Sequence, residues 1–327
     1  MAARRPPAVA RVLERITMTA RTHGMFTPGD LVLLWVSGGP DSVCLLESLV
    51  RLRRLFRIRL AVFHMDHRLR EGSAMDAAYV RRLAERHGLA FHLAVAVHRP
   101  GRSDSIEMWA RFERAREAAR VAREIGATRM ADGHTLDDQA ETILMGLVLG
   151  WGLEGMGGIA PVNGALVRPM LDVTREDVAA LCRALHLRPR HDPTNADTTL
   201  LRNALRLEAI PAIERSTGRE VRRTFARTAD HLRRDATTLF AQADQHAKTL
   251  IEVHDRGFAI RARPLLDLPP ALSSRVARRG FQRADLGWDH EAIDAVLDLA
   301  AGSPGRKRDL LLGIRARRTR THVEVEG

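Results

Sequence analysis

The hydrophobic pattern between residues 31 and 150 alternates between two periods. Short runs rich in aliphatic and β-branched residues indicate buried strands at 31–36, 58–64, 89–97 and 128–134. Longer amphipathic stretches indicate helices at 42–54, 73–87, 105–125 and 137–149. This alternation predicts an α/β fold with a parallel sheet sandwiched by helices, and it places ligands at the carboxyl ends of the strands. Ser73 and Asp76 have the spacing of a capping box at the start of the second helix.

The pattern changes after residue 150. A glycine-containing loop reaches residue 168, and a helix is predicted at 174–187, with a turn at 192–195. A long amphipathic helix at about 219–254 then leads into shorter helices and a strand-like segment, HVEVE, at the end of the chain. These features predict a catalytic domain at 1–215 and a smaller, mostly helical C-terminal domain at 216–327.

Length and charge narrow the functional class. A chain of 327 residues exceeds what one core usually organises, which agrees with two domains. The formal net charge is +12, and half of it lies in residues 216–327, most densely in 306–320. All but two basic residues are arginine, and nucleotide bias in a genome explains that choice without explaining the excess of base over acid. The charge therefore favours nucleic acid as a partner.

The sequence predicts no membrane span, no signal peptide and no site built on cysteines. The longest uncharged stretch, residues 155–167, has thirteen residues, fewer than the ~18 that a membrane span requires. Charged residues interrupt the N-terminal segment, which lacks the apolar core of a signal peptide. We therefore expect no membrane association and a cytoplasmic location. Cys44 and Cys182 form no CxxC pair, so no disulfide framework or metal-sulfur cluster is expected.

The sharpest motif follows the first strand and reads SGGPDS, formed by Ser37, Gly38, Gly39, Pro40, Asp41 and Ser42. Two adjacent glycines let backbone N–H groups approach an anion, and the following helix N-terminus adds partial positive charge. The motif lacks the lysine of a Walker loop. A turn in which Asp41 or Ser42 only caps the helix is the alternative. The motif predicts a phosphate-binding loop.

A second block, ADGHTLDDQAET, spans residues 131–142 where a predicted strand passes into a helix. Asp137 and Asp138 offer hard oxygen ligands, which suit Mg²⁺ bound by one or two carboxylates and by phosphates. His134 is placed to steady the reacting phosphate or base. Acids at a helix start also favour the helix dipole, which is the simpler alternative.

Two further motifs carry basic side chains. Residues 64–70 read HMDHRLR at the end of the second strand, although a pair such as His64 and His67 is more often structural. Glu107, Arg111 and Arg114 fall on one face of a predicted helix. An ordinary solvated ion pair is the alternative for that face, contributing a few tenths of a kcal/mol.

The order of these blocks resembles the N-type ATP pyrophosphatases, the PP-loop superfamily with an adenine nucleotide alpha hydrolase-like fold. That superfamily includes GMP, NAD and asparagine synthetases, tRNA thiolases and lysidine synthetases. The later blocks are similar to the lysidine synthetase family: HMDHRLR, RPML at 168–171, DPTNAD at 192–197 and RNALR at 202–206. The similarity is collinear over about residues 31–211. Ala115, Leu149 and Trp151 depart from the family pattern.

The resemblance implies an enzyme that uses ATP and Mg²⁺ to adenylate the wobble cytidine of a tRNA(Ile) with a CAU anticodon and then joins free L-lysine to it. It implies catalytic roles for Asp41, His134, Asp137, Asp138 and Arg111, with Asp41 and Asp137 as Mg²⁺ ligands. The loop residues 37–42 and His64 would bind ATP. Arg114, Arg202 and Arg206 would bind tRNA, and charge density adds Arg315, Arg317 and Arg318.

Two alternatives remain open from the sequence. A tRNA thiolase activates the same kind of carbonyl but needs a sulfur carrier, and both Cys44 and Cys182 lie on apolar helix faces that suit buried packing. A non-catalytic RNA-binding protein on the same fold is the second alternative. The intact loop and the DDQAET acids argue against it.

Overall fold

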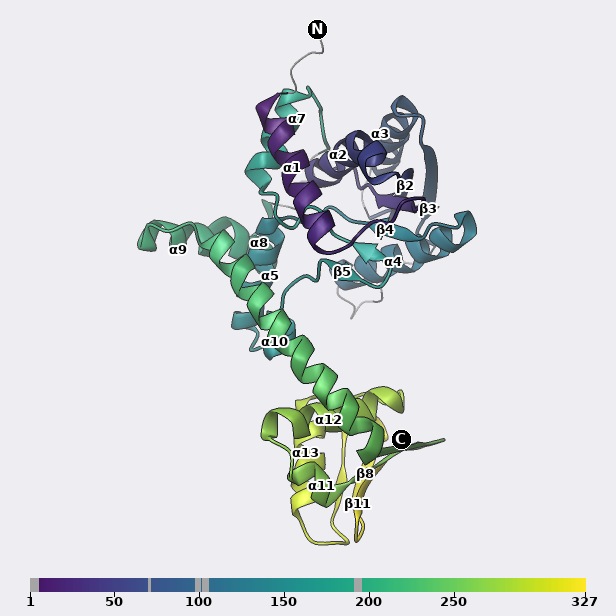
Figure 1. The fold of residues 1–327 in the computed structure, drawn as a ribbon, viewed down its shortest axis with the longest axis vertical. Coiled ribbons are helices and arrows are strands. Elements are labelled where there is room, and N and C mark those ends of the chain that lie inside the picture. The colour runs from purple at the N-terminus through teal and green to yellow at the C-terminus, as the bar shows by residue number, and fades with distance from the viewer. Residues whose placement is uncertain (1–5, 70–71, 98–100, 102–105, 191–195) are drawn as a thin grey trace. The chain divides into compact units, whose positions relative to one another are not determined.

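The computed structural model describes residues 6–69, 72–97, 101, 106–190 and 196–327. Contacts within the chain divide it into two compact units, Met1–Asp230 and His231–Gly327. Figure 1 shows an α/β first unit and a second unit in which helices accompany a sheet. The division falls inside helix α10 (Val221–Leu250). The functional boundary predicted near residue 216 stays a prediction.

The first unit contains a six-stranded sheet with the order β3-β2-β1-β4-β6-β5. Its strands are β1 (Leu31–Trp35), β2 (Arg59–Asp66), β3 (Ala90–Val95), β4 (Arg129–Ala131), β5 (Val162–Asn163) and β6 (Leu166–Val167). All neighbours pair in parallel except β5, which pairs antiparallel with β6. The predicted parallel α/β sheet is confirmed. The chain adds strands on one side of β1 and then on the other, so the carboxyl ends of β1 and β4 form the switch point where such sheets bind ligands.

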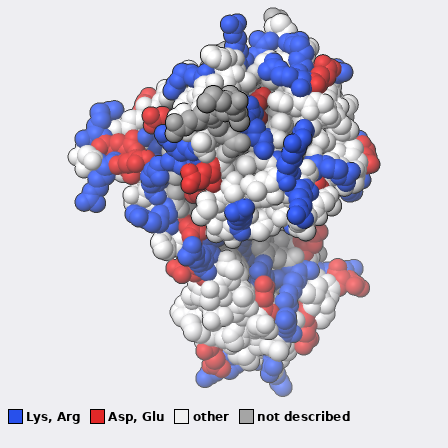
Figure 2. All heavy atoms as spheres, turned by 45° about the horizontal axis from the view of Figure 1, so that its top comes forward, with Lys and Arg blue, Asp and Glu red and all other residues white. Residues whose placement is uncertain are grey.

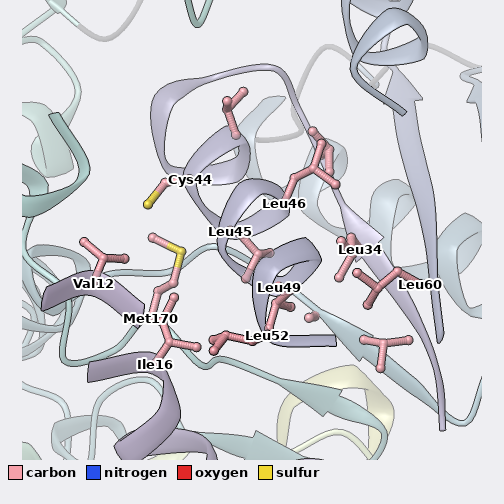
Figure 3. Close-up of a cluster of buried hydrophobic side chains, with 14 of the residues drawn as sticks. Val12, Ile16, Leu34, Cys44, Leu45, Leu46, Leu49, Leu52, Leu60 and Met170 are labelled. Atoms are coloured by element: carbon pink, nitrogen blue, oxygen red, sulfur yellow. The ribbon is translucent and has the colours of Figure 1, made fainter. Parts of the chain in front are cut away.

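Helices cover both faces of this sheet (Figure 1). Val32 and Leu34 of β1 pack in one core with α1, α2, α3 and α7. Figure 3 shows part of that core, where Leu34 lies near Leu46 and Leu49 of α2. Leu33 belongs to a second core, which it forms with residues of α4. Since both faces of β1 are buried, the strand is apolar at successive positions rather than at alternate ones.

The helices of the first unit agree with five predicted segments, at 42–54, 73–87, 105–125, 137–149 and 174–187, and add others. They are α1 (Pro7–Thr22), α2 (Pro40–Phe56), α3 (Ser73–Arg86), α4 (Ile106–Ile125), α5 (Leu136–Val148), α6 (Leu153–Met156), α7 (Arg175–Ala184), α8 (Leu201–Ala204) and α9 (Ile210–Thr217), with a π-helical turn at Leu205–Ala209. The sequence analysis assigned no helix to α1, which buries Val12 and Ile16. The turn predicted at 192–195 lies outside the described residues.

The capping box predicted at Ser73 is wrong. The N-cap of α3 is Gly72, with a φ of +88° and no side-chain capping bond, and Ser73 is already the first helical residue. Capping boxes do occur at α5 and α7, where Thr135 and Thr174 each exchange hydrogen bonds with an aspartate three residues later. The motif therefore marks helix starts in this chain, but its presence in sequence does not guarantee that the cap forms.

The second unit contains an antiparallel five-stranded sheet with the order β7-β8-β11-β10-β9. Its elements are β7 (Ile251–His254), β8 (Gly257–Arg261), α11 (Ala262–Leu266), α12 (Pro270–Arg283), α13 (His290–Ala301), β9 (Lys307–Asp309), a 3-10 turn (Leu311–Gly313), β10 (Arg315–Arg318) and β11 (His322–Glu326). The predicted terminal strand HVEVE is confirmed as β11. The long helix ends at Leu250 rather than near residue 254, because the chain turns into β7 there. A mostly helical C-terminal domain was expected, and this sheet is the feature that the expectation omitted.

Within the described ranges, no helix is both long enough and apolar enough to cross a membrane.

Figure 2 shows basic side chains spread over the visible face, with acidic side chains among them. Net charge by itself therefore does not mark one binding surface. The local pairing of each arginine has to be considered.

Candidate functional site

The phosphate loop lies at the switch point, directly after β1. Gly38 has a φ of +96°, a conformation that favours glycine. Its N–H donates to Oγ of Ser42 at 3.1 Å, and that hydroxyl donates to the Gly39 carbonyl at 2.9 Å. Gly39 is the N-cap of α2 and makes no side-chain capping bond, whereas Asp41 and Ser42 lie inside the helix. The capping alternative therefore does not apply, and the helix start keeps N–H groups for an anion.

Two other segments close around this loop. A Cβ on Gly133 would lie 3.1 Å from the carbonyl oxygen of Asp41, so the absence of a side chain there lets the end of β4 approach the loop. The backbone N–H of Arg190 donates to the Gly38 carbonyl at 2.9 Å, and its guanidinium stacks over Tyr79 at 5.5 Å. No sequence motif pointed to Arg190. The approach of Gly133 joins the loop to the block that contains the predicted acids.

Asp41 lies among the carboxylates of α5. Burial, followed by the charge of Asp138, raises the pKa of Asp41 to about 7. Asp137 and Glu141 also raise this pKa, while Arg175 lowers it. Negative charge is thus concentrated around Asp41, next to a loop whose helix N-terminus attracts phosphate. The family resemblance implied that Asp41 lies near the DDQAET acids, and the structure brings them together.

Asp138 and Glu141 are held by two arginines. One oxygen of Asp138 accepts hydrogen bonds from the N–H and hydroxyl of Thr135, at 2.7 and 2.9 Å. The other accepts from Arg175 at 2.8 Å and from Arg202 at 3.1 Å. Glu141 also pairs with both arginines. Burial alone would raise the pKa of Asp138, but the two guanidinium charges hold it below its usual range. Arg202, predicted to bind tRNA, lies in this network.

Asp137 has a different environment. Its carboxylate accepts from the backbone N–H of Arg175 at 2.8 Å, and Nε of Arg222 lies 3.1 Å away. A cavity of about 360 Å³ opens beside it. The charged residues that line the cavity are four acids and two bases: Asp137, Glu176, Glu214, Glu220, Arg219 and Arg222. Sequence reasoning missed Arg175 and Arg222, because nothing in their local sequence links them to α5.

His134 is fixed by a buried chain of charged residues. Its Nδ1 lies 2.6 Å from one oxygen of Asp132, and the other oxygen accepts from Nε of Arg168 at 3.0 Å. Arg168 also donates to the Ala160 carbonyl at 2.7 Å. Both Asp132 and Arg168 are buried, and although burial favours a higher pKa, the charges of His134 and Arg168 lower the pKa of Asp132. Sequence reasoning missed the pair, although Asp132 stands two residues before His134 at a strand end.

His64 of β2 and His67, just after that strand, both have lowered pKa values. Nδ1 of His64 donates to the Val36 carbonyl at 2.7 Å, and burial lowers the pKa of His64. That bond leaves Nε2 as the acceptor atom of the neutral ring. Burial and then the charge of Arg114 lower the pKa of His67 to about 4, and its ring packs against the edge of Trp109 at 5.7 Å. Arg70, the last residue of HMDHRLR, lies outside the described residues.

Similarity to known proteins identifies the family of this chain. A model of the PP-loop domain matches residues 11–213. The tRNA(Ile)-lysidine synthase of Symbiobacterium thermophilum is 38% identical over 325 residues, covering 93% of this chain and 67% of that protein. The tRNA(Ile)-lysidine synthase of Gloeobacter violaceus is 37% identical, covering 87% of each chain. The chain belongs to the tRNA(Ile)-lysidine synthase family.

One further relative is similar over only part of its length, and one solved structure is similar in fold. The lysidine synthase of Thermus thermophilus is 40% identical, and the match covers 89% of this chain but 56% of that protein. The U34-tRNA thiolase NcsA of Methanococcus maripaludis, solved with its [4Fe-4S] cluster, aligns with a TM-score of 0.58 at 17% identity. The alignment covers 69% of this chain and 78% of the thiolase. That likeness concerns the fold alone.

The family's ExxxRxxR block lies on α4. Arg111 is exposed, and Arg114 is half-buried near the histidines after β2, whose pKa values its charge helps to lower. The structure thus brings Arg114 to the HMDHRLR block. The side chain of Glu107 lies outside the described residues. The roles predicted for Arg111 and Arg114 stay predictions, as does that for Arg206, which is half-buried in the π-helical turn.

Trp151, where this chain departs from the family pattern, packs against two glycines. A Cβ on Gly146 would lie 3.0 Å from the Trp151 ring, and a Cβ on Gly155 would lie 2.7 Å from its Cβ. Gly146 belongs to α5 and Gly155 to α6. The indole therefore joins the two helices, a packing role that a small polar residue at position 151 could not fill.

The cysteines lie in the first core rather than at the loop. Cys44 and Cys182 are both free and buried, on α2 and α7. Figure 3 shows Cys44 among Val12, Leu45 and Met170. Burial raises the pKa of Cys182 to about 11 and raises that of Cys44 further still. Both thiols are therefore protonated at neutral pH, which suits packing more than sulfur transfer.

The arginines predicted to bind tRNA in the second unit lie on β10, beside the acidic strand β11. Arg315 and Arg317 of β10 stand opposite Glu326 and Glu324 of β11, and Arg317 pairs with Glu324 at 2.6 Å. Arg318 donates to the carbonyl of Thr319 at 2.5 Å. Their predicted contact with tRNA stays a prediction.

Proposed function

We propose that this protein joins free L-lysine to the wobble cytidine of a tRNA(Ile) with a CAU anticodon, in the cytoplasm and at the expense of ATP. The observation that carries the proposal is the meeting of the phosphate loop, which includes Asp41, with Asp137 and His134 at the switch point of the sheet. Membership of the lysidine synthase family supports this reading of the site.

Mg²⁺ would be held by Asp41 and Asp137. Burial and neighbouring carboxylates raise the pKa of Asp41 to about 7. A divalent cation bound beside Asp41 would offset the repulsion between these carboxylates. Within the described residues no group of three or more metal-ligating side chains occurs, which agrees with a Mg²⁺ that takes its remaining ligands from ATP phosphates and water. The ion would supply charge neutralisation at the phosphates. The described partners of Asp138 give it a structural role, holding Arg175 and Arg202.

The residues of the chain position the reacting groups rather than react themselves. The loop N–H groups and the α2 N-terminus would bind the phosphates as the cytidine O2 attacks the α-phosphorus and pyrophosphate leaves. His134, held through Asp132, would contact the reacting phosphate or base. In the second step an amine of lysine attacks C2 of the activated base, loses a proton, and AMP departs with the former O2. No covalent enzyme intermediate is required.

The cavity beside Asp137 suits an amine-bearing substrate. Its lining includes Glu176, Glu214 and Glu220 in addition to Asp137. Glu214 pairs with Arg222, whereas Glu176 is exposed at the start of α7. A lysine whose ammonium groups meet these carboxylates would lie near the adenylated base. We therefore propose this cavity as the lysine site.

The direct test is an incorporation assay. Full-length protein is incubated with ATP, Mg²⁺, radiolabelled lysine and a tRNA(Ile) transcript with a CAU anticodon. We expect label in the RNA together with equimolar AMP and pyrophosphate. A transcript with a G in place of the wobble cytidine is the matched control and should accept no lysine. Absence of label with the CAU transcript, or consumption of a sulfur donor without incorporation of lysine, would contradict the proposal.

A further inference from the structure

Arg190 is joined to the phosphate loop through its main chain. After α7 the chain packs Leu187 against the first core before it reaches this residue. The N–H of Arg190 then donates to the Gly38 carbonyl at 2.9 Å. A Cβ on Gly38 would lie 3.7 Å from Cγ of Arg190, so the stem of the side chain lies next to the α-carbon of that glycine. The base of this arginine is therefore fixed beside the loop.

An aromatic ring supports the guanidinium of Arg190. The guanidinium carbon lies 5.5 Å from the centre of the Tyr79 ring on α3. Nε lies 3.7 Å from a carboxylate oxygen of Asp76, which makes an ion pair but is too long for a hydrogen bond. That pair involves Nε rather than the two terminal nitrogens. Because an arginine stacked through its planar face keeps its edge N–H groups for an oxyanion, this guanidinium is suited to bind phosphate.

Other arginines near the loop hold acids by shorter contacts. They are Arg168, Arg175, Arg202 and Arg222, and their partners are Asp132, Asp137, Asp138, Glu141 and Glu214. The side chain of Arg190 is 42% exposed, and its contact with Asp76 is longer than each of these. Turning toward a ligand therefore costs Arg190 less than it costs an arginine held in a short, buried ion pair.

The chemistry at the loop favours a full positive charge on the Gly38 side. The motif SGGPDS contains no lysine, and its one acid, Asp41, is crowded by the carboxylates of α5. The N–H groups of the loop and the α2 N-terminus supply only partial charges. Pyrophosphate gains negative charge as it leaves the α-phosphorus, so a cation that contacts the leaving group lowers the barrier.

We propose that Arg190 is a catalytic residue that binds the departing pyrophosphate. This inference rests on the proposed function, because it assumes that ATP is cleaved between its α- and β-phosphates at this loop. As the cytidine O2 forms its bond to the α-phosphorus, the bond to the bridging oxygen breaks and its electron pair goes to pyrophosphate. The terminal nitrogens of Arg190 donate to oxygens of that leaving group, while Tyr79 and the main-chain bond to Gly38 hold the arginine in place.

The first experiment measures binding of inorganic pyrophosphate to the full chain by calorimetry, with Mg²⁺ present. Arg190→Gln keeps the main-chain bond to Gly38 and removes the charge, so Kd for pyrophosphate should rise about tenfold. Arg190→Lys keeps the charge without the planar fork and should recover part of that loss. Kd for AMP should change less than about twofold in both variants, because AMP lacks the β- and γ-phosphates that Arg190 would contact.

The control is Arg188→Gln, which removes the same charge from an exposed position two residues earlier. Its Kd for pyrophosphate should stay within about twofold of wild type, because salt screens exposed charges that do not touch the ligand. Thermal unfolding without ligand checks that each variant is folded. An unchanged Kd in Arg190→Gln, or an equal rise in the control, would overturn the assignment. Equal weakening of AMP and pyrophosphate binding would overturn it too, since that result indicates a structural role.

The second experiment measures the single-turnover rate of AMP formation with the CAU transcript. This rate should fall about tenfold or more in Arg190→Gln and recover in part in Arg190→Lys. A normal rate in Arg190→Gln would remove the residue from the reaction. Lysine incorporation by wild type, run in parallel, separates two failures. An active wild type whose pyrophosphate binding does not depend on Arg190 refutes this role alone, whereas a wild type that neither binds pyrophosphate nor incorporates lysine refutes both proposals.

Discussion

The carboxylate of Asp132 lies 2.6 Å from Nδ1 of His134. Its second oxygen accepts from the buried guanidinium of Arg168, which comes from the end of β6. A carboxylate held in this way orients the imidazole and leaves Nε2 as the ring atom for contact with a substrate. We therefore propose that Asp132 acts as a positioning residue through His134.

Replacing Asp132 should separate orientation from folding. Asp132→Asn keeps an acceptor for His134 but removes the charge, so we expect kcat for AMP formation to fall about tenfold or more, with KM for ATP nearly unchanged. Asp132→Ala also leaves Arg168 buried without its carboxylate, which costs about 3–5 kcal/mol of stability. Steady-state kinetics and thermal unfolding of both variants check this. A normal kcat in folded Asp132→Asn would limit the residue to a structural role.

Asp41 and Asp137 should be essential for the adenylation step. Asp41→Asn and Asp137→Ala remove charge beside the phosphate loop, and we expect AMP formation to fall a hundredfold or more. The control for these variants is Asp172→Asn. Asp172 is exposed, lies outside the acid cluster and accepts a hydrogen bond from the hydroxyl of Thr19. Circular dichroism establishes that the folds are intact. Turnover close to wild type in either site variant would remove that residue from the site.

The two cysteines should be dispensable for lysine transfer. A Cys44→Ser, Cys182→Ser variant should still join lysine to tRNA at a substantial rate per folded molecule, because lysine brings its own nitrogen nucleophile. Serine hydroxyls in the first core should lower stability by roughly 1–3 kcal/mol at each unpaired site. Activity is therefore measured below the melting transition of the variant. If the folded variant released AMP but formed no modified base, thiolation would replace lysidine formation as the reading.

The proposed lysine site predicts a selective binding defect. Glu176→Gln removes one carboxylate from the cavity without touching the phosphate loop, so KM for lysine should rise roughly twofold to fivefold, the effect of one partly exposed ion pair. KM for ATP should stay constant. Glu124→Gln, on the distant end of α4, is the control. An unchanged KM for lysine, or an equal rise in KM for ATP, would contradict the assignment.

Glu47 should make stability depend on acid pH. This buried glutamate of α2 pairs with Arg51 and with Nε2 of His87, the latter at 2.8 Å. Burial alone would raise the pKa of Glu47, but these partners hold it below its ordinary value of 4.5. Its contribution is therefore fully present above pH 4.5 and is lost as pH falls through the lowered pKa. Denaturant unfolding from pH 6 to 3 should show a shallower loss in Glu47→Gln than in the exposed control Glu85→Gln.

The sequence by itself determined the elements that depend on local periodicity and glycine geometry. The apolar run at 31–36 and the glycines after it specify a buried strand followed by a phosphate loop, because few other residues permit that backbone near an anion. The family motifs then specified the acids of α5. The sequence pattern did not predict four short strands of the second unit, because segments such as RARR in β10 carry no apolar alternation.

The tertiary structure alone decided which charges meet. Arg168 stands 36 residues from Asp132, and Arg202 stands 61 from Glu141, so no local pattern could pair them. The register of β10 with β11 likewise set glutamates against Arg315 and Arg317. The physical reason is that charge–charge energies depend on distance in space and on local burial. A sequence records the number of charges, and the fold decides which of them remain uncompensated.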